Sequence, residues 1–264
     1  MDINKFYSNP DEKPLDNIVT DGGFCGIFRT IGCIGDSLSS GEFETKDENG
    51  IVGYHDFYEY SWGQFMARAT GSKVYNFSRG GMSTKWFCES FAGECGAYKR
   101  ENLCQAYIIA LGVNDLTVNP EIGNPDNYDA SLKREADDQS ILGYYAQIIR
   151  TIKAKQPDAK IFAVTIPRSV GKTEERTKRE DELAEGIRKL VAKISNAYVI
   201  DLRKYGPVHD EKFNAAFRLG HMTPAGYLLM SKLIMSYIDY IIRNNFEDFN
   251  QVGFIGTPYK YRKD

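Results

Sequence analysis

Two side chains in this sequence of 264 residues could do nucleophilic chemistry together. Ser37 lies in the stretch IGCIGDSLSSGEF (31–43), directly after an apolar run that ends in glycine and aspartate. A serine hydroxyl is a poor nucleophile until a neighbouring base takes its proton. The chain has three histidines, and His221 is the best placed, because it precedes Pro224, which can open a C-terminal helix. Both residues also have a structural interpretation, the serine as a helix N-cap and the histidine as an exposed loop residue.

Two further motifs place polar groups near turns. In NFSRGGMST (76–84), Gly80 and Gly81 precede a helical pattern and leave backbone N–H groups free to approach a ligand. In LGVND (111–115), Asn114 carries a side-chain amide that can donate a hydrogen bond. A simple turn at the glycines and an Asx turn at the asparagine are the alternatives.

Five apolar runs of strand length set the positions of these motifs. Each run is short, rich in β-branched or aromatic residues and bounded by Gly, Pro or Asn, which is typical of strands buried on both faces. The runs are residues 29–35, 73–78, 105–112, 160–167 and 197–202. Helical patterns lie between and after them, at about 56–70, 83–92, 137–155, 173–195 and 224–244.

The alternation of strand and helix predicts an α/β fold with a five-stranded parallel sheet between two layers of helices. No repeat, low-complexity run or linker divides the chain, so we expect one domain over 1–264, with a core at about 29–243 and polar extensions. In such sheets, ligands bind beyond the carboxyl ends of the strands. The serine, glycine and asparagine motifs lie at these ends.

Two long polar segments, 39–54 and 116–137, are expected to form rim loops over a site. The tail 246–264 has no evident role. An aromatic wall facing a substrate could be formed by Tyr54, Phe57, Tyr58 and Trp62. However, the spacing of Tyr58, Trp62, Phe65 and Met66 fits better with a helix packed on the sheet.

Charge and composition exclude several classes of partner. The 33 basic and 36 acidic residues are well mixed and give a formal charge of −3, so we expect no nucleic-acid partner. The polar N-terminus and the lack of a window near 18 apolar residues predict no export signal and no membrane partner. Five cysteines without CxxC spacing indicate reduced thiols in a cytoplasmic protein. They are Cys25, Cys33, Cys88, Cys95 and Cys104.

Taken together, the four motifs resemble the blocks of the SGNH (GDSL-type) hydrolase superfamily. GDSL at 35–38 matches the first block, NFSRGGMST the second through Gly81, GVND the third through Asn114, and HMTPAGY the last through His221. They occur in the family order over about residues 29–243. GDSL alone is a weak match, but four ordered blocks are specific.

The resemblance implies a flavodoxin-like three-layer fold and a serine hydrolase without metal or cofactor. His221 would activate Ser37 for attack on an ester carbonyl. The negative oxygen of the tetrahedral intermediate would be bound by the N–H of Ser37, the N–H of Gly81 and the amide of Asn114.

The sequence departs from the family at one position. An aspartate commonly stands three residues before the histidine, where it holds the imidazole in the right tautomer, but here that residue is Arg218. A cation would disfavour the imidazolium that forms during reaction. We expect His221 to be held by a backbone carbonyl instead. The alternatives are another acid or weak catalysis, and the acids considered are Asp201, Asp210 and Glu211.

The resemblance favours an esterase that removes short O-acyl groups, above all acetyl, from carbohydrates or small metabolites. A thioesterase or lysophospholipase and a catalytically weak binding module are the alternatives. Asp36, Asp115 and Arg218 are candidate substrate contacts, although the two aspartates fit loop-holding roles better and the arginine a solvated position. A small-molecule or oligosaccharide ester is the expected partner, and homo-oligomerisation is left open.

Overall fold

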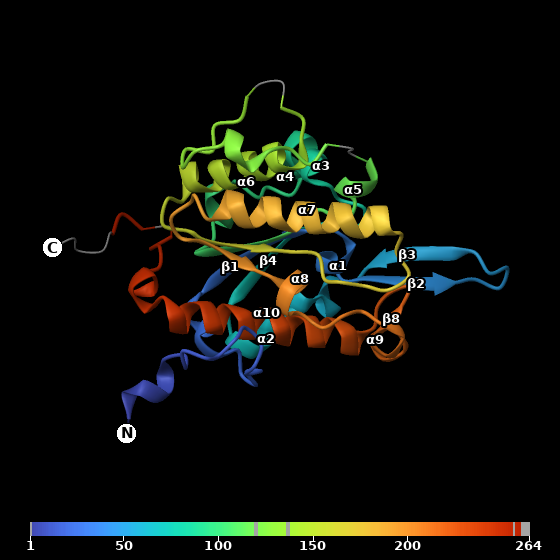
Figure 1. The fold of residues 1–264 in the computed structure, drawn as a ribbon, viewed down its shortest axis with the longest axis horizontal. Helices are drawn as coiled ribbons and strands as arrows, with labels where there is room; N and C mark the ends of the chain where they lie inside the picture. The colour runs from blue at the N-terminus through green and yellow to red at the C-terminus, as the bar shows by residue number, and fades with distance from the viewer. Residues whose placement is uncertain (1, 119–120, 136–137, 256, 260–264) are drawn as a thin grey trace.

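A five-stranded parallel sheet lies at the centre of the protein (Figure 1). The structure is a computed structural model that describes residues 2–118, 121–135, 138–255 and 257–259. The strands follow the order β4-β1-β5-β6-β7, so the five predicted runs are confirmed as strands of one sheet. They are β1 (Thr30–Gly35), β4 (Lys73–Ser78), β5 (Ala106–Ala110), β6 (Lys160–Val164) and β7 (Ala197–Ile200).

Helices cover both faces of the sheet, which confirms the three-layer prediction. In Figure 1, α6 (Ile141–Lys155) and α7 (Glu174–Val191) lie above the sheet, and α2 (Trp62–Thr70) and α10 (Pro224–Asn244) lie below it. The shorter helices are α1 (Ser37–Ser40), α3 (Thr84–Trp86), α4 (Ala92–Glu94), α5 (Asp115–Val118), α8 (Leu202–Tyr205) and α9 (Glu211–Phe217). A π-helical segment (Phe87–Phe91) joins α3 to α4, so the helix predicted at 83–92 is built from three short pieces.

Side-chain caps explain where the long helices begin. Ser140 accepts a hydrogen bond from the N–H of Gly143 at the start of α6, and Thr173 accepts one from Arg176 at the start of α7. Thr223 caps α10, and Pro224 occupies its first turn, as predicted. These oxygens satisfy N–H groups that have no partner inside the helix.

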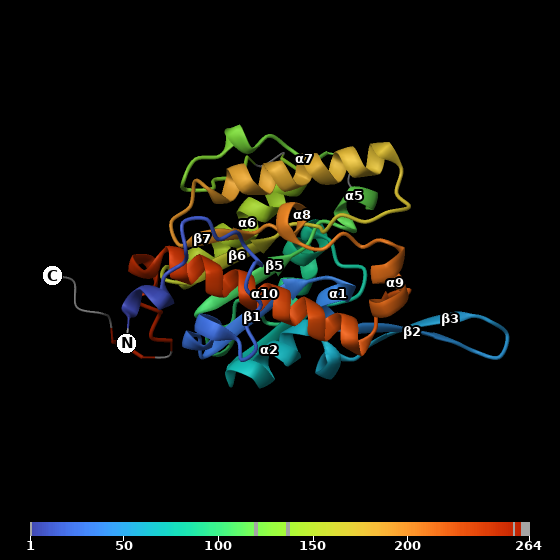
Figure 2. The same cartoon turned by 60° about the horizontal axis from the view of Figure 1, so that its bottom comes forward.

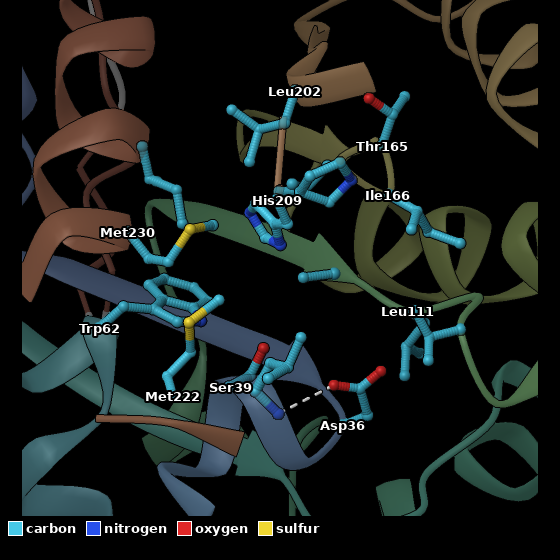
Figure 3. A pocket seen from close by; sticks show the side chains of 16 residues that line it. Asp36, Ser39, Trp62, Leu111, Thr165, Ile166, Leu202, His209, Met222 and Met230 are labelled. Carbon is cyan, nitrogen blue, oxygen red and sulfur yellow. Dashed lines mark hydrogen bonds between the residues drawn. The ribbon is translucent and has the colours of Figure 1, made fainter. Parts of the chain in front are cut away.

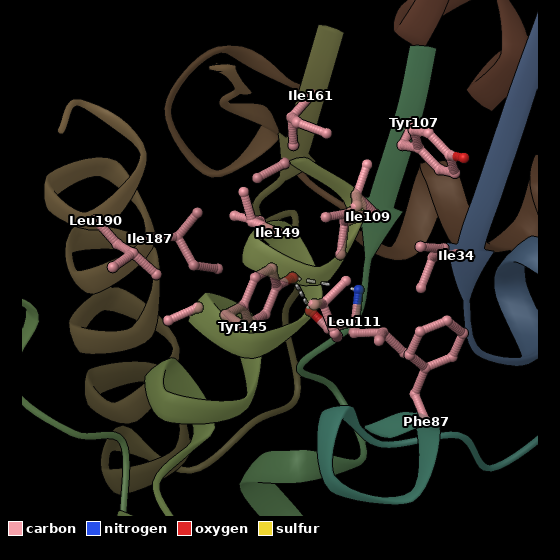
Figure 4. Packing of buried hydrophobic residues seen from close by; sticks show 14 of the residues in the cluster. Ile34, Phe87, Tyr107, Ile109, Leu111, Tyr145, Ile149, Ile161, Ile187 and Leu190 are labelled. Carbon is pink, nitrogen blue, oxygen red and sulfur yellow. Dashed lines mark hydrogen bonds between the residues drawn. The ribbon is translucent and has the colours of Figure 1, made fainter. Parts of the chain in front are cut away.

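Each face of the sheet buries its own apolar cluster. Figure 4 shows the cluster under α6 and α7, where the Tyr145 hydroxyl donates to the carbonyl of Leu111 at 2.8 Å. The second cluster lies on the opposite face, where Phe162 and Ile108 pack with Ile234 of α10. Burial on both faces explains why the strands are apolar throughout instead of alternating.

Helix α10 is long and apolar enough to cross a membrane by length and composition, although inspection of the sequence predicted no such window. However, 72% of its most apolar window is buried inside the protein. Its apolar residues therefore belong to the core cluster on the face of the sheet that it covers. Figure 2 shows how α10 runs along this face.

One of the two predicted rim loops is instead a β-hairpin. Strand β2 (Glu42–Lys46) pairs antiparallel with β3 (Val52–Asp56), and the hairpin projects from the body of the protein (Figures 1 and 2). The helix predicted at 56–70 therefore begins at Trp62, because the residues up to position 56 belong to β3. The segment 116–137 contains the end of α5 and a 3-10 turn (Pro125–Asn127), while residues 119–120 and 136–137 lie outside the described part of the chain.

Candidate active site

Three motif-bearing loops leave the sheet at one edge. The register pairs Gly35 with Ser78 of β4 and with Ala110 of β5, so these strands end side by side. Ser37, Gly81 and Asn114 follow the three strand ends within four residues. The parallel register therefore brings the serine, glycine and asparagine motifs to the same edge, where ligands bind in open α/β sheets.

Ser37 is the first residue of α1 and is half-buried. Asp36 is the N-cap, because its Oδ1 accepts a hydrogen bond from the N–H of Leu38 at 3.0 Å. The capping role that the sequence left open for Ser37 thus belongs to its neighbour. The Ser37 hydroxyl forms no hydrogen bond with the described residues, and its N–H has no partner inside α1.

A hydrogen bond from the side-chain amide of Asn114 connects the glycine motif to the asparagine motif. Gly81 is exposed at φ 72°, in the left-handed region, and a Cβ at this position would meet no atom within 4 Å. Asn114 Nδ2 donates a hydrogen bond, at 3.0 Å, to the carbonyl of Met82, the residue that follows Gly81. This bond uses one of two amide hydrogens and leaves the other for a ligand.

Asp115 fastens the same two loops from inside. Its carboxylate accepts hydrogen bonds from both the N–H and the hydroxyl of Thr84, at 2.9 Å for the N–H. Burial raises the pKa of the Asp115 carboxyl. Because Asp115 is fully buried, it holds loops together and has no surface for the substrate contact considered above.

His221 stands between two glutamates of the hairpin. It lies on β9 (His221–Met222), which pairs with β8 (Arg218–Leu219). Its Nδ1 is 2.6 Å from Glu44 Oε1 and its Nε2 is 3.0 Å from Glu42 Oε1. The contact with Glu44 has hydrogen-bond geometry, whereas the contact with Glu42 satisfies only the ion-pair distance.

The groups expected to hold His221 lie elsewhere. Asp201 accepts hydrogen bonds from Arg188 at 2.7 Å and from the hydroxyl of Thr165. Asp210 caps α9, and Glu211 is exposed on that helix. The preferred expectation of a backbone carbonyl was therefore wrong, since a carboxylate from the hairpin occupies the Nδ1 side. The alternative of another acid agrees with the structure in kind, but the acid is Glu44 and none of the three named above.

Arg218 turns away from the imidazole. Its Nε and Nη2 donate to the carbonyl of Gly220 at 3.2 and 2.9 Å, so the guanidinium folds back on its own turn. The residue at the family's aspartate position thus supports the turn that leads into His221.

The hairpin also brings carboxylates to the glycine motif. One oxygen of Glu42 lies against Gly80, where a Cβ would overlap it. Burial raises the pKa of the Glu42 carboxyl, while the nearby charge of His221 lowers it. Asp56 accepts from the N–H of Gly80 at 3.4 Å. Within the described part of the chain, no group of His, Cys, Asp or Glu side chains is arranged to hold a metal ion.

Sequence reasoning missed these hairpin residues, although the alternation in EFETK could have revealed them. In a strand, positions 42 and 44 share one face, while position 43 faces the other way. Phe43 packs against Tyr227, which leaves the two glutamates on the side of His221.

Tyr227 connects the serine and histidine segments. From α10, its hydroxyl donates to the carbonyl of Glu42 at 2.6 Å and lies 3.5 Å from the carbonyl of Ser37. In addition, α1 contacts β9. The two segments therefore lie next to each other, although the side chains of Ser37 and His221 form no hydrogen bond with each other in this structure.

The aromatic residues considered for a substrate-facing wall lie in two places, some packed on the sheet and Tyr54 exposed near His221. Trp62 is buried and the Tyr58 hydroxyl donates to the carbonyl of Val74, so both pack on the sheet. Tyr54 of β3 is 60% exposed, and its ring centre lies 5.9 Å from that of His221. The Tyr54 ring is therefore accessible beside the site.

A small apolar cavity of about 70 Å³ adjoins the serine and histidine segments (Figure 3). Asp36 and Leu38, the neighbours of Ser37, line it together with Met222, the neighbour of His221. His209 also lines it, and burial lowers the pKa of that imidazole to about 4, which keeps the ring neutral at pH 7. The other lining residues include Trp62, Leu111, Val113, Ile166 and Met230.

Comparison with known proteins identifies a family and a set of structural neighbours. The GDSL-like Lipase/Acylhydrolase family matches residues 33–229. No curated protein matches the sequence.

Solved structures of carbohydrate esterases share the fold. A Corynascus thermopiles family 2 enzyme with a carbohydrate binding domain has a TM-score of 0.54 at 16% identity, covering 80% of this chain and 65% of its own. A Clostridium thermocellum family two esterase, in complex with cellohexaose, has a TM-score of 0.54 at 17% identity, covering 90% and 66%. A Clostridium thermocellum family 3 esterase has a TM-score of 0.50 at 14% identity, covering 81% and 96%. The chain thus spans slightly less than two thirds of the two family 2 enzymes.

Proposed function

The chain belongs to the GDSL-like lipase/acylhydrolase family and is a carboxylic ester hydrolase; from this premise we propose that it removes short O-acyl groups, above all acetyl, from carbohydrates or small metabolites. One observation carries the proposal. The register of β1, β4 and β5 ends these strands side by side, just before Ser37, Gly81 and Asn114, and helix α1, which begins at Ser37, contacts β9, which begins at His221. Nucleophile, base and oxyanion donors are the groups that acyl transfer needs.

The proposed reaction has two steps. His221 Nε2 takes the hydroxyl proton of Ser37 as the serine oxygen attacks the ester carbonyl, and the imidazolium then gives that proton to the departing alcohol oxygen. The acyl group is now bound to Ser37. Water attacks this ester in the same way, and the carboxylic acid leaves as the serine regains its proton.

The N–H groups of Ser37 and Gly81 and the free amide hydrogen of Asn114 stabilise the negative oxygen of each tetrahedral intermediate. Loss of one such donor typically costs about 3 kcal/mol of transition-state stabilisation. The bond from Asn114 to the Met82 carbonyl supports this role, because it fixes the amide relative to the glycine motif.

Cavity size supports a short acyl group. The cavity of about 70 Å³ beside Asp36 and Leu38 matches a few methyl or methylene groups better than it matches a long chain. The accessible ring of Tyr54 beside His221 supports a sugar as the alcohol, since an aromatic face offers apolar contact to a sugar ring. A carbohydrate esterase neighbour is a complex with cellohexaose, which agrees with this assignment. We also propose a cytoplasmic location, supported by five free cysteines.

A series of 4-nitrophenyl esters from acetyl to decanoyl tests the proposal. We expect the highest kcat/KM with about two to four carbons, and a decline with longer chains that overfill the cavity. Acetylated oligosaccharides then test the alcohol by release of acetate. A maximum at eight carbons or more would instead indicate a thioesterase or lysophospholipase.

Two variants test the catalytic assignment. Ser37→Ala and His221→Ala should each lower kcat by at least about 1,000-fold, with nearly equal effects because the two side chains act as a unit. A wild-type protein that binds acetylated sugars and hydrolyses none of these esters would identify a binding module.

A further inference from the structure

We infer that Glu44 is the positioning residue of His221, and that the β2–β3 hairpin supplies the carboxylate that the chain lacks at position 218. This inference rests on the proposed esterase function. Glu44 would accept the Nδ1–H of the imidazole and leave Nε2 without a proton, as the base for Ser37.

The contact between the two side chains has the geometry that this role requires. The distance from His221 Nδ1 to Glu44 Oε1 is 2.6 Å, and the side chains are 20% and 24% exposed. An ionised carboxylate only accepts hydrogen bonds, so the ring must donate from Nδ1. The tautomer with a proton on Nδ1 is the one that can take a proton at Nε2.

A glycine makes room for the glutamate. Gly220 directly precedes His221 and has φ 72°, in the left-handed region that favours glycine. A Cβ at this position would overlap the carboxyl group of Glu44. The turn that presents the histidine is therefore shaped to accept a carboxylate from the hairpin.

Glu42 does not fit the positioning role. It lies 3.0 Å from Nε2, the nitrogen that must serve Ser37, and without hydrogen-bond geometry. A group that oriented the ring from this side would compete with the serine hydroxyl. The orienting contact is therefore made by Glu44, two residues further along the same face of β2.

The substitution Glu44→Gln tests the inference, because the amide keeps the shape of the side chain and removes its charge. We expect kcat to fall by about 100-fold or more with KM nearly unchanged, as for the loss of a triad acid. The control is Glu48→Gln, in the exposed turn of the same hairpin, which should keep wild-type kcat. Gly220→Ala should reproduce the loss while leaving the carboxylate in the chain.

A spectroscopic readout separates positioning from a general effect on stability. Wild-type protein should show a low-field proton NMR resonance for the Nδ1–H of His221, and Glu44→Gln should lose it. A kcat of Glu44→Gln within about threefold of wild type would overturn the inference, and so would the absence of the resonance from wild type. A different result would contradict the proposed function itself, namely a Ser37→Ala protein that keeps its esterase activity. If Glu44→Gln does not fold, the resonance of the wild type and the kcat of Gly220→Ala decide.

Discussion

Asp36 shows how a single residue beside the nucleophile can hold the site at an energetic cost. It is 4% exposed, and burial raises the pKa of its carboxyl from 3.8 to about 7, with a smaller contribution from the charge of Asp115. The carboxyl nevertheless accepts the Leu38 N–H that starts the helix of Ser37. The turn is thus secured by a group whose charged form is disfavoured in the folded state.

The first prediction concerns the charge of Asp36. The folded protein holds this proton more tightly than the unfolded chain, so the group destabilises the fold as pH rises from about 4 and reaches its full effect above about 7. Asp36→Asn keeps an oxygen for the Leu38 N–H and removes the charge. It should raise the free energy of unfolding by about 4 kcal/mol at pH 8 and have little effect at pH 4.

Urea denaturation of both proteins at pH 4, 6 and 8 measures this effect. A difference in unfolding free energy that is the same at all three pH values would contradict the assignment, because it could not arise from titration of Asp36.

At the scale of elements, the sequence predicted the strands and helices whose own residues show a clear apolar pattern. The apolar runs of the sheet and the pattern of α10 were unambiguous because burial on one or two faces dictates residue type. The hairpin lacked that signal, since β3 is largely exposed and β2 is buried at one end only. Its turn signal, Asn49-Gly50, together with the alternation around Phe43, would have identified it.

The partner of His221 could not be predicted from the sequence for a different reason. Glu44 and His221 are 177 residues apart, and their contact depends on where the hairpin leaves the body of the protein. Ser37, Gly81 and Asn114 were easier to place, because each directly follows a strand of one parallel sheet. Motif position therefore predicts the elements that meet, whereas tertiary packing decides which carboxylate reaches the imidazole.

A second prediction follows for the hairpin, which must hold its own shape because a two-stranded ribbon is marginally stable alone. Asp47 Oδ1 accepts from the N–H groups of Asn49 and Ile51, at 2.9 and 2.8 Å, and so fixes the turn. Asp47→Ala should increase hydrogen exchange across residues 42–56 and lower kcat severalfold through Glu44. Global stability should change by less than about 1 kcal/mol, because the turn lies outside the core.

Glu48→Ala, in the same turn, is the matched control for Asp47→Ala and should leave both exchange and kcat near wild type. If Asp47→Ala showed faster hydrogen exchange without any loss of kcat, the rigidity of the hairpin would not matter for catalysis and the prediction would be wrong.

At the scale of the whole molecule, described segments on both sides of the matched family region are bound to the core. In the C-terminal segment, Phe249 stacks on Tyr198 at 5.2 Å between ring centres, and the carbonyl of Gly253 accepts from Gln105. In the N-terminal segment, Ser8 donates to Asn244 at the end of α10. The described part of the tail thus packs at the end of the sheet where the strands begin, a role that its composition did not indicate.

An ion pair between Glu12 and Arg243 also holds the N-terminal segment, and the third prediction concerns this pair. Glu12 binds Arg243, which also binds Asp239 at 2.7 Å, and the hydrogen bond from Arg243 lowers the pKa of the Glu12 carboxyl to about 2. This stabilisation is present above about pH 4.5 and is lost as pH falls toward 2. Glu12→Gln should therefore lower the free energy of unfolding by about 2 kcal/mol at pH 7 and by almost nothing at pH 2, as measured by urea denaturation.

Esterase activity of Glu12→Gln should be unchanged, because 20 residues of α10 place Arg243 about 30 Å from the start of the helix beside His221. A loss of kcat in a fully folded Glu12→Gln protein would show instead that the N-terminal segment is coupled to the site through α10.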